Sequence, residues 1–186
     1  MQAMSAVLFY TVGLPGAGKT TFAASLSAWC GAPHLRGDLI GLQLFRFPTF
    51  SPEQRRAVYA EMNRRVAENL QKGRHIIYDA AVNTRAQREQ LASLAQQYNA
   101  TAVGIFVEVP TPLAQKRAAT LRDASIVGPV ARLIPPEIFA KYAAAFEVPT
   151  HTEPVVRVRG DAPFALQYRR LQRQLRAHGI QLPRFI

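Results

Sequence analysis

Short apolar runs alternate along the chain with longer segments in which apolar residues recur every three or four positions. The short runs have the length and composition of buried strands, and the longer segments have the period of helices that bury one side. The predicted strands cover residues 6–12, 34–36, 75–79, 102–109 and 155–159. Strands that alternate with helices in this way predict an α/β fold, with a parallel sheet of about five strands and helices on both faces.

The helical segments carry their own start and stop signals. One helix is expected to begin after Ser51, a preferred capping residue followed by Pro52, and to continue to about Gln71 before Gly73. Its apolar stripe consists of Val58, Met62, Val66 and Leu70. The other predicted helices cover 19 to about 30, a stretch from about 39, and about 84–98, 111–122, 136–146 and 163–178.

Length and composition indicate one domain. The chain has 186 residues and 48% apolar content, which suits a single domain spanning 1–186. Its single cysteine, Cys30, can form no internal disulfide, and no apolar run approaches the roughly 18 residues needed to cross a bilayer. The first apolar run leads directly into a glycine-rich stretch, so we interpret it as a strand. We therefore expect a soluble cytoplasmic protein without membrane contact.

The glycine-rich stretch carries the clearest chemistry. Residues 13–20 read Gly-Leu-Pro-Gly-Ala-Gly-Lys-Thr and fit the pattern G-x-x-x-x-G-K-[ST] between a strand and a helix. Glycines let successive N–H groups point into one concavity, and the helix N-terminus favours an anion there. Lys19 is expected to reach the β- and γ-phosphates of a nucleotide and the Thr20 hydroxyl to bind Mg²⁺. The predicted nucleotide-binding residues are Gly13, Leu14, Pro15, Gly16, Ala17, Gly18, Lys19, Thr20 and Thr21.

Two aspartates follow predicted strands and are expected at the ligand-binding edge of the sheet. Asp38 is our candidate for the carboxylate that orients an acceptor hydroxyl or takes its proton, and it also suits the N-cap of a helix beginning near Leu39. Asp79 is a candidate for contact with Mg²⁺. Binding of substrate, or hydrogen bonding to the turn 80–84, is an equal alternative for Asp79.

Positively charged residues lie on a predicted helix that leads into an irregular stretch between the fourth and fifth strands. The helix that starts near Thr111 carries Lys116, Arg117 and Arg122, and the chain is irregular through Gly128-Pro129. Such a segment suits a lid, about 111–148, that clamps a transferring phosphoryl group, although ordinary surface arginines are the alternative.

Positive charge is the other marked feature of the composition. The chain has 23 basic and 12 acidic residues, a net charge of +11, and only four of the basic residues are lysines. An arginine excess suits bidentate contact with phosphate and favours a polyanionic substrate or a nucleic-acid partner, and genomic base composition or solubility is an equal alternative. The predicted helix 163–178 contributes a basic side, which is either solvated or in contact with nucleic acid. In another helix, Arg85 and Arg88 in the first turn oppose the helix dipole and indicate an anionic group nearby.

The order of these features resembles the small P-loop kinases grouped with the polynucleotide 5′-kinase domain. The resemblance rests on the phosphate loop, Asp38, the segment 76–79 and the helix 112–122. It also includes residues 136–150 and Glu153, and it covers nearly the whole chain up to about Arg159. It implies a single P-loop NTPase domain that uses ATP and Mg²⁺.

The resemblance also implies roles for individual residues. Lys19 and Thr20 match the phosphate and metal residues, Asp38 the activating carboxylate, and Asp79 the strand-end aspartate. Arg117 and Arg122 resemble the two lid arginines, although the family usually places these one residue closer together. Where polynucleotide kinases carry an arginine three positions after the activating aspartate, this chain has Gly41.

The sequence therefore predicts a phosphotransferase that moves the γ-phosphate of ATP to a hydroxyl acceptor, in the manner of a polynucleotide 5′-kinase. A kinase of small metabolites, sugars or antibiotics is the related alternative. A nucleotide-binding module without transfer and an RNA-binding protein are alternatives of other classes. The pattern does not indicate an oligomeric state.

Overall fold

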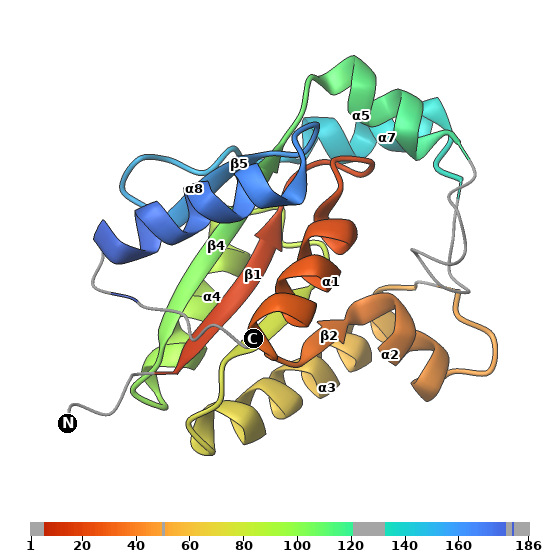
Figure 1. Ribbon diagram of the computed structural model, residues 1–186. Coiled ribbons are helices and arrows are strands. Elements are labelled where there is room, and N and C mark those ends of the chain that lie inside the picture. The colour runs from red at the N-terminus through yellow and green to blue at the C-terminus, as the bar shows by residue number, and fades with distance from the viewer. Residues whose placement is uncertain (1–5, 50, 121–132, 178–179, 181–186) are drawn as a thin grey trace.

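The computed structural model describes residues 6–49, 51–120, 133–177 and 180. Its centre is a parallel sheet of five strands in the order β2-β3-β1-β4-β5 (Figure 1). The strands are β1 Val7–Val12, β2 His34–Arg36, β3 Ile76–Asp79, β4 Thr101–Glu108 and β5 Val155–Arg159. The alternation of strands and helices thus forms the predicted α/β fold of a P-loop NTPase domain.

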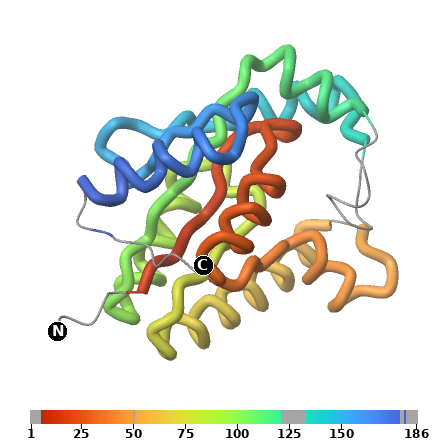
Figure 2. The backbone as a smooth tube through the Cα atoms, in the orientation of Figure 1, coloured from red at the N-terminus to blue at the C-terminus, as the bar shows by residue number. Residues whose placement is uncertain are grey.

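Helices cover both faces of this sheet. The helices are α1 Lys19–Cys30, α2 Gly37–Leu44, α3 Pro52–Gln71, α4 Arg85–Gln96, α5 Thr111–Ala118, α7 Pro136–Ala144 and α8 Phe164–Ala177. Buried side chains of α1 and α8 pack on one face, and those of α3 and α4 pack on the other. The helices α5 and α7 pack against each other beyond the end to which β1 points (Figures 1 and 2). Within the described residues, no helix is long and apolar enough to cross a membrane.

Most element boundaries match the prediction. The Ser51 hydroxyl caps α3 by accepting from the Gln54 N–H, and Met62, Val66 and Leu70 are buried as the helical stripe requires. The prediction of a helix that begins near Leu39 with Asp38 as its cap was wrong. The helix α2 begins at Gly37, because Arg36 is still extended and serves as the N-cap. Asp38 therefore lies inside the first turn.

Several predictions fall on residues outside the described part of the chain. Arg122 and residues 121–132 of the expected lid are among them, as is His178 at the expected end of the basic helix. The described parts of the expected lid are residues 111–120 and 133–148, which include α5 and α7.

Candidate active site

The phosphate loop connects β1 to α1 at the edge of the sheet where the strands end. No acidic residue lies in the first turn of α1, and its N-cap, Gly18, offers no capping side chain. The backbone N–H groups of this turn are therefore directed toward the loop without a side-chain cap, which suits an anion. The Lys19 ammonium donates to the carbonyl oxygens of Gly13 at 2.8 Å and Leu14 at 3.0 Å, so it lies folded over the loop.

Two glycines allow neighbouring segments to approach the loop closely. Gly16 has φ of +82°, and a Cβ there would lie 2.1 Å from the carbonyl oxygen of Ala114 in α5. Gly160 follows β5, and a Cβ there would lie 2.1 Å from the carbonyl oxygen of Ala17. The loop is thus held between the first helix of the expected lid and the end of β5.

Arg117 lies beside this contact. Its guanidinium donates to the Gly160 carbonyl at 3.1 Å, which brings a cation of α5 next to the segment that touches the loop. The structure therefore places the first of the two predicted lid arginines close to the phosphate loop. The second, Arg122, lies outside the described residues.

Asp79 ends β3 beneath the start of α1. Its side chain is 5% exposed, and its two oxygens accept from the Thr11 hydroxyl and from the His34 ring, each at 3.0 Å. Burial raises the pKa of Asp79, but hydrogen bonds from His34 and Thr20 and the charge of Lys19 outweigh that effect, so the pKa is lowered. Asp79 is therefore an ionised carboxylate next to the two phosphate-loop residues that were expected to bind phosphate and metal.

The turn after β3 is held by another residue. The Gln87 side-chain oxygen accepts from the N–H groups of Asn83 and Thr84, while the Thr84 hydroxyl caps α4. Asp79 makes no hydrogen bond to this turn within the described residues. The alternative in which Asp79 fixes the turn 80–84 was therefore wrong.

Asp38 is held in place by an arginine two residues earlier. Arg36 donates from Nε to Oδ1 at 3.1 Å and from Nη2 to Oδ2 at 2.6 Å, and the Leu39 N–H also donates to Oδ1 at 2.8 Å. The Asp38 side chain remains 31% exposed. Among the described residues, Oδ1 accepts two hydrogen bonds and Oδ2 accepts one, so Oδ2 retains a lone pair for an acceptor hydroxyl.

The pairing of β2 with β3 brings the two aspartates to one edge. Arg36 is the register partner of Asp79, so Asp38 follows directly beyond the end of β3. A Cβ on Gly37 would lie 3.3 Å from the Cβ of Ala80, which shows how closely the two strand ends approach. The phosphate loop, Asp79 and Asp38 therefore lie along the same end of the sheet.

The donor set near Thr20 and Asp79 fits Mg²⁺. One hydroxyl and one carboxylate are hard oxygen ligands, and Mg²⁺ in nucleotide sites takes most of its remaining ligands from phosphate and water. Among the described residues there is no group of three or more His, Cys, Asp or Glu side chains arranged as a protein cage for a metal. The residues thus suit a cation that arrives with a nucleotide.

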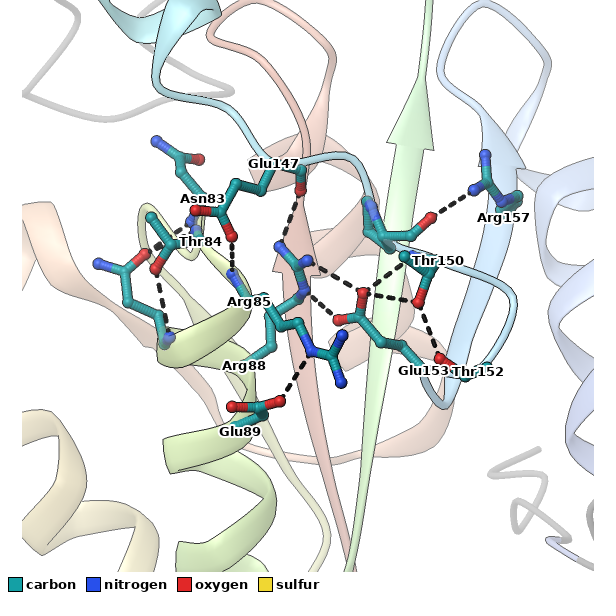
Figure 3. A network of polar contacts seen from close by, with 12 residues as sticks. Asn83, Thr84, Arg85, Arg88, Glu89, Glu147, Thr150, Thr152, Glu153 and Arg157 are labelled. Carbon is teal, nitrogen blue, oxygen red and sulfur yellow. Dashed lines mark hydrogen bonds and ion pairs between the residues drawn. The ribbon is translucent and has the colours of Figure 1, made fainter.

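A polar network joins α4 to the segment that connects α7 to β5 (Figure 3). Arg88 of α4 pairs with both oxygens of Glu153, with side chains only 2% and 9% exposed, and donates to the Glu147 carbonyl at 3.0 Å. The Glu147 carboxylate accepts from the Arg85 N–H at 2.6 Å. The anionic group expected near Arg85 and Arg88 is therefore part of this chain, and it fixes the segment that connects α7 to β5.

The roles of His34, Arg36 and Thr11 were not predicted from the sequence. The available signal was the period of two, which places His34 and Arg36 on one face of β2, just before Asp38 in the chain. The contact between His34 and Asp79 could be recognised only once β2 was known to pair with β3.

Comparison with known proteins identifies a family and a fold. A family model described as an AAA domain, AAA_33, matches residues 8–149. A search of curated proteins finds no match. Among solved structures, Kti12 from Chaetomium thermophilum in complex with ADP-AlF3 is 18% identical, with a TM-score of 0.70 and coverage of 91% of this chain and 98% of that one.

Two further structures share the fold. A gluconokinase from Sinorhizobium meliloti is 15% identical, with a TM-score of 0.65 and coverage of 96% of this chain and 95% of that one. A chain of the Pnkp1/Rnl/Hen1 RNA repair complex is 20% identical, with a TM-score of 0.63 and coverage of 76% of this chain and 44% of that one. At these identities the similarity establishes the fold alone.

Proposed function

Because the chain belongs to the AAA_33 family of AAA domains, we propose that it is an ATP-dependent phosphotransferase that moves the γ-phosphate to a hydroxyl acceptor. The observation that carries this proposal is the position of Asp38. A carboxylate held by Arg36, with a lone pair still available on Oδ2, lies at the same end of the sheet as the phosphate loop. A module that only bound nucleotide would not need this second, oriented carboxylate.

In the proposed reaction the acceptor oxygen attacks the γ-phosphorus and the bond to the β–γ bridging oxygen breaks, so that ADP leaves. The loop N–H groups and Lys19 hold the β- and γ-phosphates, and Asp38 orients the acceptor hydroxyl and takes up its proton. Arg117, already beside the loop, offsets negative charge between the attacking and leaving oxygens. Arg122 is proposed to act with it.

Thr20 and Asp79 are the residues proposed to hold Mg²⁺, directly or through water, and the ion would neutralise charge on the phosphates. Thr11 and His34 keep the Asp79 carboxylate in position for that contact. The nucleotide contacts are assigned to residues 13–21, with ATP as the donor.

For the acceptor, we favour the 5′-hydroxyl of a polynucleotide. The net charge of +11 favours a polyanionic partner, and one structural neighbour belongs to an RNA repair complex. A small-metabolite acceptor is the second candidate, supported by Gly41 at the position where polynucleotide kinases carry an arginine and by the gluconokinase neighbour. We place the reaction in the cytoplasm, where ATP and a reduced Cys30 are expected.

The substitution Asp38→Asn separates transfer from binding. It preserves the size of the side chain but weakens its ability to accept a proton, so we expect ATP affinity within about twofold of wild type and a loss of transfer of 100-fold or more. Nucleotide binding is measured by calorimetry, and transfer is measured by the incorporation of labelled γ-phosphate into the acceptor. Equal transfer by Asp38→Asn and wild type would exclude Asp38 as the catalytic carboxylate.

A further inference from the structure

The outer face of α8 carries four arginines. These residues, Arg169, Arg170, Arg173 and Arg176, are all exposed, and the helix contains no acidic residue. No ion pair or hydrogen bond joins their guanidinium groups to another described residue. By contrast, three exposed arginines elsewhere, Arg56, Arg64 and Arg85, each pair with a glutamate one helical turn away. We call these four residues the arginine stripe.

Helix geometry places the stripe on one side. Arg169, Arg173 and Arg176 are separated by four and three residues, so they lie along one line over about 10 Å of helix. The apolar side of α8 is already occupied, because Tyr168, Leu171 and Leu175 are buried in the core shared with α1. The stripe is therefore on the exposed side of α8. The helix itself lies along the sheet, where it contacts β5 and α1 (Figure 1).

An exposed aromatic side chain packs against the residue that precedes the stripe. Trp29, in the last turn of α1, is 43% exposed, and its ring centre lies 4.9 Å from that of Tyr168. Tyr168 immediately precedes Arg169 and accepts from the Gln172 amide at 3.0 Å, so its position is fixed. Trp29 consequently presents part of a ring supported by Tyr168, the residue that precedes Arg169 in the chain.

We propose that the arginine stripe and Trp29 form a binding surface for single-stranded nucleic acid. Arginines at helical spacing contact successive phosphates, and an exposed aromatic ring provides a platform on which a base stacks. A membrane surface fits less well, because the apolar residues that would insert into lipid are buried in the core. The arginines of the surface lie on α8, which packs against β5, whereas Asp38 follows β2 at the opposite edge of the sheet. It therefore anchors a strand away from the reacting atoms, and it does not depend on the proposed activity.

Trp29 is the only tryptophan, so its fluorescence reports on this surface directly. The full chain, without nucleotide, is titrated with 20-nucleotide oligo(U) and oligo(dT) at several salt concentrations. Binding is expected to quench Trp29, and the affinity should fall about 20- to 50-fold between 50 and 200 mM salt if three or four phosphates are neutralised.

The test variant is Arg169→Gln/Arg173→Gln/Arg176→Gln, and the control is Lys72→Gln/Arg74→Gln/Lys141→Gln. The control removes the same charge from exposed residues elsewhere. We expect the affinity of the stripe variant to be at least tenfold lower than that of the wild type at 50 mM salt. The slope of log K against log salt should become shallower by about two, and the affinity of the control variant should change less than threefold. Lys19→Ala should bind oligonucleotide as wild type does, which separates this proposal from the phosphotransferase.

Three results would overturn the proposal. Absence of oligonucleotide binding is the first. Equal loss in the stripe and control variants is the second, since binding would then follow net charge alone. The third is stripe-dependent binding to vesicles rich in phosphatidylserine with no binding to either oligonucleotide, which would identify a membrane contact instead.

Discussion

The two strand-end aspartates have different surroundings, and these suit different tasks. Asp79 is almost fully buried and both of its oxygens accept hydrogen bonds, whereas Asp38 is partly exposed and keeps a lone pair on Oδ2. A carboxylate that must meet an incoming hydroxyl needs access, and one beside a phosphate-bound cation needs a fixed, ionised position. Arg36 sets the orientation of the accessible Asp38 carboxylate.

The substitution Arg36→Lys tests that orientation. Lysine keeps the charge but cannot reproduce the two-pronged contact with Asp38, so the carboxylate should sample other rotamers. We expect kcat to fall about tenfold while KM for ATP changes less than twofold, as measured by steady-state kinetics. An unchanged kcat would show that Asp38 does not need Arg36 for its alignment.

Among the secondary-structure elements, α4 and the segment 147–153 depend on each other. The segment carries no regular structure between α7 and β5, yet Arg88 holds it through Glu153 and through the Glu147 carbonyl (Figure 3). A buried ion pair that loses one partner leaves an uncompensated charge in the interior. Arg88 therefore fixes the segment that follows α7, while α7 itself also packs against α5.

The substitution Glu153→Gln is expected to lower the free energy of unfolding by about 3–5 kcal/mol, because Arg88 stays buried without its counter-charge. Glu89→Gln, which breaks an exposed pair with Arg85, should change it little. Denaturant unfolding of both variants measures the difference. Similar losses in the two variants would contradict the structural role of Arg88 and Glu153.

The same pair should contribute to acid sensitivity. Hydrogen bonds from Arg88 lower the pKa of Glu153 below its ordinary 4.5, so its stabilising effect is complete above about pH 4.5 and is lost as the pH falls through the lower folded value. Stability of the wild type should therefore decrease more steeply below pH 4.5 than stability of Glu153→Gln.

The end of β5 and the phosphate loop form a second pair of dependent elements. Gly160→Ala places a methyl group on the Ala17 carbonyl, which must shift the loop. We expect nucleotide affinity to fall at least tenfold, as measured by calorimetry. Gly41→Ala is the control, because its Cβ makes ordinary contact with Val58, and it should leave affinity unchanged. A nucleotide affinity equal to that of the wild type in Gly160→Ala would contradict this dependence of the phosphate loop on the end of β5.

Across the whole fold, the sequence predicted the features that are set by residues close together in the chain. The five strands and the phosphate loop follow from apolar period and glycine spacing, and the parallel sheet follows from their alternation. Contacts between distant residues did not follow: Arg88 and Glu153 are 65 positions apart, and His34 and Asp79 are 45 apart. The order β2-β3-β1-β4-β5 had to be known before those side chains could be paired.

The most direct test of the phosphotransferase is transfer of labelled γ-phosphate from ATP in the presence of Mg²⁺. Oligonucleotides of DNA and RNA with 5′-hydroxyl ends are offered beside a pooled metabolite extract, with Lys19→Ala as the control. We predict label on the oligonucleotides that depends on Lys19, whereas label only in the metabolite pool would assign a small-molecule kinase. Absence of any Lys19-dependent transfer, in a protein that still binds ATP, would contradict the phosphotransferase and leave a nucleotide-binding module.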